Sequence, residues 1–203
     1  MRIRTAELSD CKAIAIMHRI NLDKSFLGSL GTGFLKILYQ AINNHQGGFL
    51  IVAVENNELA GFVSGVDDVK SFYKLFLYKK WLAAIFAIIP KLFSLNIIKK
   101  VIETFSYGGH DSEISLPKAE LLSIAVNEKY RGQGISTQLF EELANNFKLK
   151  GIKEFKIIVG SDLLPARKFY SKIGCVERAS TQIHQGQESI ILAYSIQPNQ
   201  VVL

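Results

Sequence analysis

Residues 125–136, AVNEKYRGQGIS, bring an arginine, two glycines and a serine together between an apolar run and a helical pattern. The first turn of a helix leaves backbone N–H groups without partners, and these groups carry partial positive charge. Gly132 and Gly134 have no Cβ, so a ligand can approach those donors closely. Arg131 adds a full charge. The stretch therefore indicates an anion site suited to phosphate, and a plain tight turn is the alternative.

The spacing of these residues excludes two common nucleotide-binding motifs. RGQGIS is neither GxxxxGK[ST] nor GxGxxG, so the phosphate-binding loop of nucleotide triphosphatases and the Rossmann dinucleotide fingerprint both fail to fit. Any phosphate-bearing ligand here is expected to belong to a different class.

The wider context carries a resemblance to a known family. LLSIAVNEKYRGQGIS, followed by ARKFYSKIGC, strongly resembles the GCN5-related N-acetyltransferase (GNAT) superfamily, whose signature is [RQ]xxGx[GA]. In this chain the signature is Arg131, Gly132, Gln133, Gly134, Ile135 and Ser136. Ser136 departs from the usual Gly or Ala but is also small. The resemblance covers residues 119–176 with good specificity and residues 1–66 in pattern only.

The resemblance implies that acetyl-CoA is the cosubstrate and assigns a role to each matched position. Backbone amides from Gly132 to Ser136 would hold the pyrophosphate. The strand residues Ile124, Ala125 and Val126 would pair with the pantetheine arm as an added strand. The Ile124 amide would polarise the thioester carbonyl, where one preorganised donor contributes about 3 kcal/mol. An ordinary core strand is the alternative for these three residues.

Two side chains are the expected catalytic groups. The resemblance places Tyr170 near the sulfur of the cofactor, where a phenol with a pKa near 10 can protonate the leaving thiolate. Glu120 opens the strand and matches a catalytic glutamate of some relatives, acting on the amine directly or through water. The alternatives are an aromatic side chain that covers the sheet and a solvated carboxylate at a strand end.

Other positions are weaker candidates. Many relatives have an asparagine that holds the cofactor where this chain has Ser161, Asp162 and Leu163, and Cys175 is expected to be a small core residue, not a nucleophile. Weaker candidates for the base or for the wall of the acceptor site lie in the loop before the strand: Tyr107, His110, Asp111 and Glu113.

The elements that must position these residues follow from hydrophobic periodicity and turn residues. Strands are expected at 2–8, in a hairpin over 47–66, and at 119–126, 155–160 and 187–196. Helices are expected at 11–20, 31–45, 134–151 and 164–174, with two more in the insert. This order predicts an α+β fold, a GNAT fold with a central mixed, mostly antiparallel sheet flanked by helices. A single domain over residues 1–203 is the simplest organisation.

Residues 67–118 are expected to form a helical insert between the third and fourth strands, and the resemblance implies that it walls the acceptor side. Trp81, Phe86 and Phe93 are expected to pack against the core or against a second subunit in a homodimer. Clustered lysines could attract an anionic acceptor such as a nucleotide-linked amino sugar, or could be a solvated edge: Lys79, Lys80, Lys99 and Lys100. Pro90 and Lys91 interrupt the apolar segment 81–98, and the uninterrupted run 81–89 is too short for a transmembrane span.

Composition narrows the classes of ligand and the cellular setting that are expected. The formal net charge of +6 suits an anionic ligand, but we find no basic and aromatic repeat that would indicate nucleic-acid binding. Cys11 and Cys175 have no CxxC partner, so no disulfide framework is expected and the expected setting is the cytoplasm. The four histidines lack metal-ligand spacing, so no metal is expected.

The sequence thus predicts an acetyl-CoA-dependent N-acetyltransferase in which a primary amine attacks directly. The acceptor would be an amino sugar or another small amine. A catalytically silent CoA-binding regulatory protein and a membrane-surface protein are the alternatives.

Overall fold

The computed structural model describes residues 1–22, 25–88, 116–184 and 187–197 of the 203-residue chain. Seven strands form one sheet in the order β1-β2-β3-β4-β5-β7-β6. The strands are β1 (Arg2–Thr5), β2 (Gly48–Glu55), β3 (Glu58–Val66), β4 (Glu120–Val126), β5 (Glu154–Gly160), β6 (Val176–His184) and β7 (Gln187–Ser195). All neighbouring pairs are antiparallel except β4 and β5, which are parallel. The predicted mixed, mostly antiparallel sheet is confirmed.

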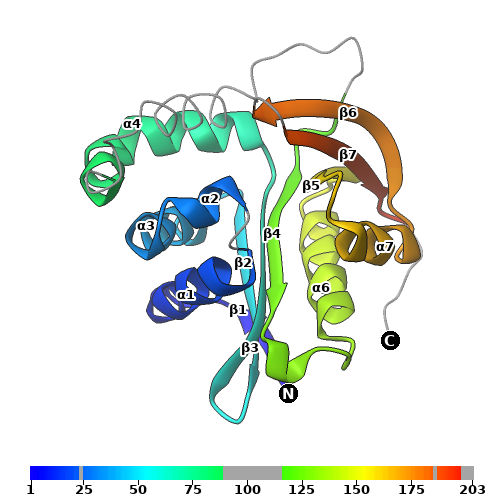
Figure 1. The fold of residues 1–203 in the computed structure, drawn as a ribbon, viewed down its shortest axis with the longest axis horizontal. Coiled ribbons are helices and arrows are strands. Elements are labelled where there is room, and N and C mark those ends of the chain that lie inside the picture. Colours follow the sequence, from blue (N-terminus) through cyan, green and yellow to red (C-terminus); the bar gives the residue numbers. More distant parts are fainter. Residues whose placement is uncertain (23–24, 89–115, 185–186, 198–203) are drawn as a thin grey trace.

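Helices cover both faces of this sheet (Figure 1). The α-helices are α1 (Cys11–Asn21), α2 (Phe26–Ser29), α3 (Thr32–Asn43), α4 (Val69–Ile88), α6 (Ile135–Leu149) and α7 (Leu164–Lys172), and the short 3-10 helices are η1 (Leu8–Asp10) and η4 (Glu128–Tyr130). Helices α1 to α4 lie on one face, and α6 and α7 lie on the other. The insert between β3 and β4 therefore begins as a helix on the α1 face.

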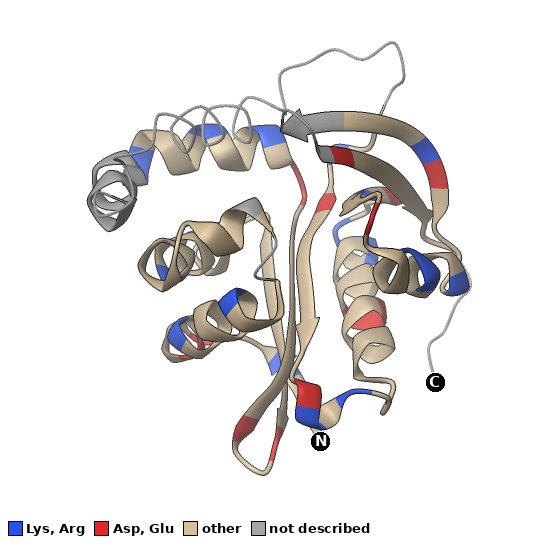
Figure 2. Ribbon diagram, viewed as in Figure 1, with Lys and Arg blue, Asp and Glu red and all other residues tan. Residues whose placement is uncertain are grey.

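Each face has its own apolar core, because strand side chains alternate between the two sides. The α1 face buries Phe34, Tyr39 and Phe62 among others, and the α6 face buries Phe140, Phe147 and Phe155. Charged residues avoid the middle of the sheet: β3 and β4 carry only one each, at their first residues (Figure 2). A polar side chain that β3 or β4 buries is therefore surrounded mainly by apolar side chains.

The structure corrects the predicted strands at one place. Strand β6 follows α7 and pairs with β7 at the edge of the sheet. The sequence analysis assigned no strand between residues 174 and 187. The segment VERASTQIH has little apolar alternation, and even its first apolar residue, Val176, is 59% exposed. An edge strand that buries few side chains leaves a weak periodic signal.

The feature that matters most for function is the parting of β4 from β5. Only two residue pairs join them, Glu120↔Lys156 and Leu121↔Ile157. Opposite β3, the register shifts so that Gly65 pairs with Leu121 and Ser64 pairs with Ser123, which leaves Leu122 as an extra residue. Such a bulge bends a strand. From there β4 stays with β3 while β5 stays with β7 along its whole length.

Candidate active site

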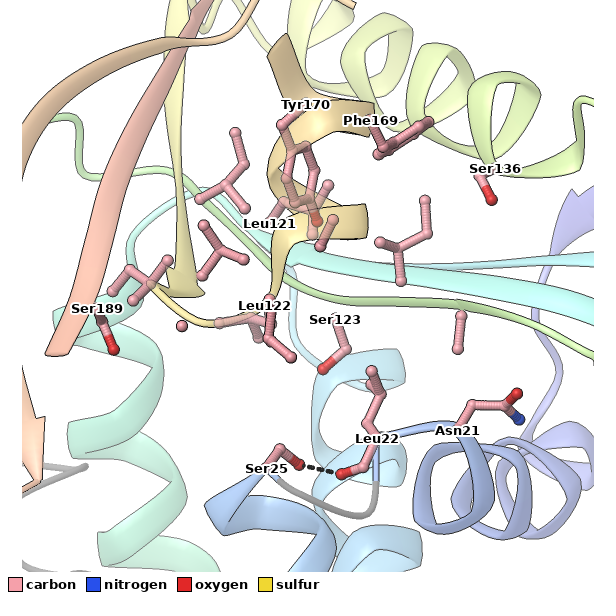
Figure 3. A pocket seen from close by; sticks show the side chains of 18 of the residues that line it. Asn21, Leu22, Ser25, Leu121, Leu122, Ser123, Ser136, Phe169, Tyr170 and Ser189 are labelled. Atoms are coloured by element: carbon pink, nitrogen blue, oxygen red, sulfur yellow. Dashed lines mark hydrogen bonds between the residues drawn. The ribbon is translucent and has the colours of Figure 1, made fainter. Parts of the chain in front are cut away.

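A cleft of about 1300 Å³ lies where β4 and β5 part. Its walls come from β4, β5, α7, the end of α1 and the segment that follows α1. Figure 3 shows Tyr170 entering from the α7 side and Ser123, Leu22 and Asn21 lying on the α1 side. The cleft therefore connects the two faces of the sheet.

The backbone of β4 presents unpaired groups to this cleft. The Asn127 N–H donates to the Ala60 carbonyl of β3 at 2.9 Å, and the Val126 carbonyl on the opposite edge accepts from Arg131 Nε at 3.5 Å. Backbone groups alternate in direction along a strand, so the N–H groups of Ile124 and Val126 face away from β3. The Ala125 N–H faces β3.

The turn before α6 has the form that the sequence indicated. Gly132 and Gly134 have φ of +78° and +76°, a left-handed backbone that favours glycine. Little stands above them: a Cβ at Gly132 would meet nothing within 4 Å, and one at Gly134 would meet only Gln138 Nε2 at 4.0 Å. No side chain caps α6, whose N-cap residue is Gly134. The N-terminal amides of α6 are thus accessible from solvent.

Arg131 does not extend freely into solvent. Its guanidinium donates to Asn21 Oδ1 at 2.7 Å, while Asn21 Nδ2 donates to the Met17 carbonyl at 3.0 Å. This contact ties the turn before α6 to the C-terminal end of α1 across the mouth of the cleft. Ser136 lines the cleft, Gln133 is exposed, and Ile135 is buried in the core.

Tyr170 projects from α7 and lines the cleft, although only 5% of the residue is exposed. Its ring packs against Phe140 and Phe169. No hydrogen-bond partner for its hydroxyl occurs in the described part of the chain. Burial and the nearby Cys175 raise the pKa of Tyr170 far above its usual value, so the phenol keeps its proton at neutral pH and can donate it.

Glu120 occupies a different environment from the one expected at a strand end. The residue is 7% exposed and does not appear among the described residues that line the cleft. Lys156 Nζ lies 3.5 Å from Glu120 Oε2 but donates its hydrogen bond to the Pro117 carbonyl at 2.7 Å. Burial raises the pKa of Glu120 to about 7, and Lys156 partly opposes the rise.

Some of the weaker candidates line the cleft, and others lie elsewhere or outside the described residues. Ser161, Asp162 and Leu163 line the cleft, whereas Cys175 is buried and burial raises the pKa of its thiol to about 12. Lys79 is exposed on α4 and is not a cleft residue. Several predicted acceptor-side residues lie outside the described residues: Tyr107, His110, Asp111, Glu113, Lys99, Lys100 and Phe93, together with the side chains of Lys80, Trp81 and Phe86.

Sequence reasoning missed a group of polar cleft residues on the α1 face. His18, only 1% exposed, lines the cleft and contacts both Ser25 and Tyr39. Burial lowers the pKa of His18 to about 4, so its ring is neutral at physiological pH. The sequence signal was weak, because these residues form one site only after the helices pack on the sheet.

Comparison with known families shows the family of the chain. A family model described as "Acetyltransferase (GNAT) family" matches residues 17–175. The chain belongs to the GNAT acetyltransferase family. GNAT proteins are N-acetyltransferases, so the chain is an enzyme of the acyltransferase class. The matched region includes the parted strands, the glycine turn and Tyr170.

Solved GNAT-like structures share the fold at low sequence identity. SsHAT is similar with a TM-score of 0.71 and 18% identity, covering 97% of this chain and 98% of that one. The ribosomal-protein-S18-alanine N-acetyltransferase from Escherichia coli gives a TM-score of 0.58 at 16% identity, covering 100% and 97%. An N-acetyltransferase from Staphylococcus aureus Mu50 gives 0.62 at 16%, covering 97% and 98%.

None of the curated proteins matches the chain in sequence. In the described ranges, no helix combines the length and apolar character needed to cross a membrane. Within the same ranges, no three His, Cys, Asp or Glu side chains are grouped as a metal ion would require.

The buried, neutral His18 gives a testable dependence of stability on pH. Its pKa is about 4 in the folded chain and near 6.5 when exposed, so the unfolded state binds the extra proton between these values. One pKa unit corresponds to about 1.4 kcal/mol, so His18 should remove about 3 kcal/mol of folding stability as pH falls from 7 to 4.

Urea unfolding of wild type and His18→Gln across this pH range checks this. The difference in unfolding free energy between the two proteins should shift in favour of the variant as pH falls. A difference that does not change with pH would contradict a buried, neutral His18.

Proposed function

We propose that this GNAT enzyme transfers an acetyl group from acetyl-CoA to a primary amine, which attacks the thioester directly. The observation that carries the proposal is the cleft between β4 and β5, where backbone amides of β4 and of the turn before α6 are accessible together. An extended amide-bearing arm can pair with the free edge of β4, and a pyrophosphate fits the helix N-terminus.

The residues present fit this cosubstrate. The two left-handed glycines leave open space where a Cβ would otherwise stand, and Arg131 supplies a cation beside them. When bound, acetyl-CoA supplies the acetyl group as a thioester. Ile124 and Val126 would bind the pantetheine arm through their backbone, and Gly132 to Ser136 would bind the pyrophosphate, with Gln133 and Ile135 contributing backbone amides only.

The catalytic roles are proposals that the local chemistry supports. The Ile124 N–H would stabilise the negative charge that develops on the carbonyl oxygen. The Tyr170 hydroxyl, protonated at neutral pH and without a protein partner in the described residues, would donate its proton to the departing sulfur. The Glu120 carboxyl would take a proton from the acceptor through water rather than by contact, because it is not a cleft residue.

The acceptor is proposed to be a small amine, with an amino sugar as one member of that class. The solved relatives include a ribosomal-protein-S18-alanine N-acetyltransferase, so a peptide that begins with alanine belongs in the same acceptor screen. The two cysteines are unpaired and buried, which fits a reducing compartment such as the cytoplasm.

Gly134→Val tests the phosphate end of the cleft. A β-branched residue is strained at φ of +76°, and its methyl groups would stand where the phosphate approaches. We expect the Kd for acetyl-CoA, measured by isothermal titration calorimetry, to rise about tenfold or more. Gly151→Val, at the same φ beyond the end of α6, is the matched control. Equal weakening in both variants, or in neither, would contradict the assignment.

Tyr170→Phe tests the proposed acid, because it keeps the ring and removes only the hydroxyl. We expect kcat to fall about 100-fold while the Kd for acetyl-CoA stays close to that of wild type. Thiol release during acetyl transfer measures the rate, and Tyr194→Phe serves as the control for loss of a phenol on the same face. Unchanged turnover would assign Tyr170 to packing alone.

Glu120→Gln tests the proposed base. A carboxyl with a pKa of about 7 accepts protons poorly below that pH, so kcat/KM of the wild type should fall on the acidic side of pH 7. The variant should lose this limb and turn over about 10 to 100 times more slowly. In Glu120→Gln, Lys156 loses the nearby carboxylate. Circular dichroism of the variant checks that it is still folded. A folded variant with the wild-type pH profile would remove Glu120 from the mechanism.

A further inference from the structure

Lys156 is a charged residue buried in an internal strand of the sheet, and it has no part in the roles assigned above. It is the third residue of β5, and only 5% of it is exposed. Its neighbours along the strand, Phe155 and Ile157, are buried apolar residues. Lysine is almost never fully buried unless its charge is paired. The partners of Lys156 therefore indicate what the buried ammonium does.

The side chain and the backbone of Lys156 both bind the segment that leads into β4. Its Nζ donates to the Pro117 carbonyl at 2.7 Å, and its backbone N–H donates to the Ala119 carbonyl at 2.9 Å. The Lys118 carbonyl, between them, accepts the N–H of Val69, the first residue of α4, at 3.1 Å. Three successive carbonyls are thus held, and the start of β4 is fixed to both α4 and β5.

Glu120 follows directly, and its carboxyl lies beside the same ammonium. Glu120 and Lys156 are register partners across the two strands, and Lys156 Nζ lies 3.5 Å from Glu120 Oε2. The side chains are 7% exposed in Lys156 and 9% exposed in Glu120. Glu120 Oε2 accepts no hydrogen bond from any residue that the structure describes. The ammonium is therefore placed to stabilise a negative charge on this carboxyl.

The buried pair adjoins the cleft without lining it. The next register pair, Leu121 and Ile157, does line the cleft, and the strands part beyond it. Leu121 and Ile157 pack in the core of the α6 face. Because side chains alternate along a strand, Glu120 and Lys156 point to the other face. Lys156 can therefore affect the reaction by acting on Glu120, and not by touching a substrate.

Two elements bring titratable groups to Glu120: β5 brings Lys156, and α4 brings Tyr73. Burial raises the pKa of Tyr73 far above its usual value, so its phenol is neutral at pH 7 and adds no charge. Burial raises the pKa of Glu120 as well, to about 7, and Lys156 opposes this rise. Among the described residues, Lys156 is the cation that favours the ionised form of Glu120.

We propose that Lys156 is a positioning residue for acetyl transfer, whose ammonium stabilises the charged form of the Glu120 carboxyl at the first residue of β4. This inference rests on the proposed function, in which Glu120 takes a proton from the acceptor amine through water. The hydrogen bond to Pro117 holds the ammonium in place. The charge of Lys156 then sets the pH range over which Glu120 can accept a proton.

Lys156→Met tests this role, because it keeps an unbranched side chain and removes the charge. A carboxyl that loses an opposite charge at this distance has its pKa raised by about 1 to 3 units. The acidic limb of kcat/KM should move to higher pH by that amount, and kcat/KM at pH 7 should fall about tenfold or more. Lys156→Arg keeps the charge and should leave the limb near that of wild type. The acceptor is the most active of spermidine, glucosamine and a peptide that begins with alanine.

The same pH series separates this role from damage to packing. A structural defect would lower kcat/KM by one factor at every pH, whereas the loss in Lys156→Met should shrink as pH rises. Added to Glu120→Gln, Lys156→Met should change the pH profile little, because the group through which it acts is gone. Lys153→Met, at an exposed lysine just before β5, is the matched control and should keep the wild-type profile. An unshifted limb, or an equal loss in the Glu120→Gln background, would overturn the proposal.

A second measurement needs no acetyl transfer. Carbon-13 NMR of the glutamate carboxyls, assigned with Glu120→Gln, follows the titration of Glu120 in wild type and in Lys156→Met. The pKa of Glu120 should be higher in the variant, and an equal pKa would overturn the proposal. If Lys156→Met does not fold, Lys156→Gln takes its place in both measurements, because its amide can still donate to the Pro117 carbonyl.

The two measurements distinguish this proposal from the proposed function. A raised Glu120 pKa with an unshifted limb would overturn the role of Lys156 in the reaction while acetyl transfer stands. A wild-type protein that transfers no acetyl group to any of these amines would remove the proposed function, and with it this role. The NMR titration would still decide whether Lys156 sets the ionisation of Glu120.

Discussion

The edge of β4 that faces β5 is the constraint on which the site depends. After two residue pairs the strands part, and the N–H groups of Ile124 and Val126 are left facing a cleft in the middle of the sheet. Backbone donors without partners are costly when they are kept from water. The chain resolves this by keeping the cleft open to solvent, and an extended ligand can satisfy the same donors. The vacancy in the hydrogen-bond ladder is therefore the proposed binding site.

Three features hold the strands apart. The extra residue at Leu122 bends β4, full pairing with β7 commits β5 to the other half of the sheet, and Tyr170 extends from α7 into the gap. The contact between Arg131 and Asn21 then joins the glycine turn to α1. The glycine turn and the end of α1 are therefore joined parts of one cleft wall.

The sequence predicted the parts of the site whose chemistry is local. A glycine turn before a helix is encoded by adjacent residues, and so its backbone form was predictable. Edge strand β6 was missed because it buries little apolar surface. The burial of His18 in the cleft wall was missed because its partner Tyr39 is on another helix. Glu120 was expected either at the surface or in the reaction. Only the folded sheet shows that it is buried, beside Lys156 of β5.

Hydrogen–deuterium exchange with and without acetyl-CoA tests the central claim most directly, because it reports on single backbone amides. The account predicts that the amides of Ile124, Val126 and residues 132–136 gain protection when acetyl-CoA binds, while those of β6 at the sheet edge do not change. Binding that leaves the amides of Ile124 and Val126 exchanging at the same rate would contradict it.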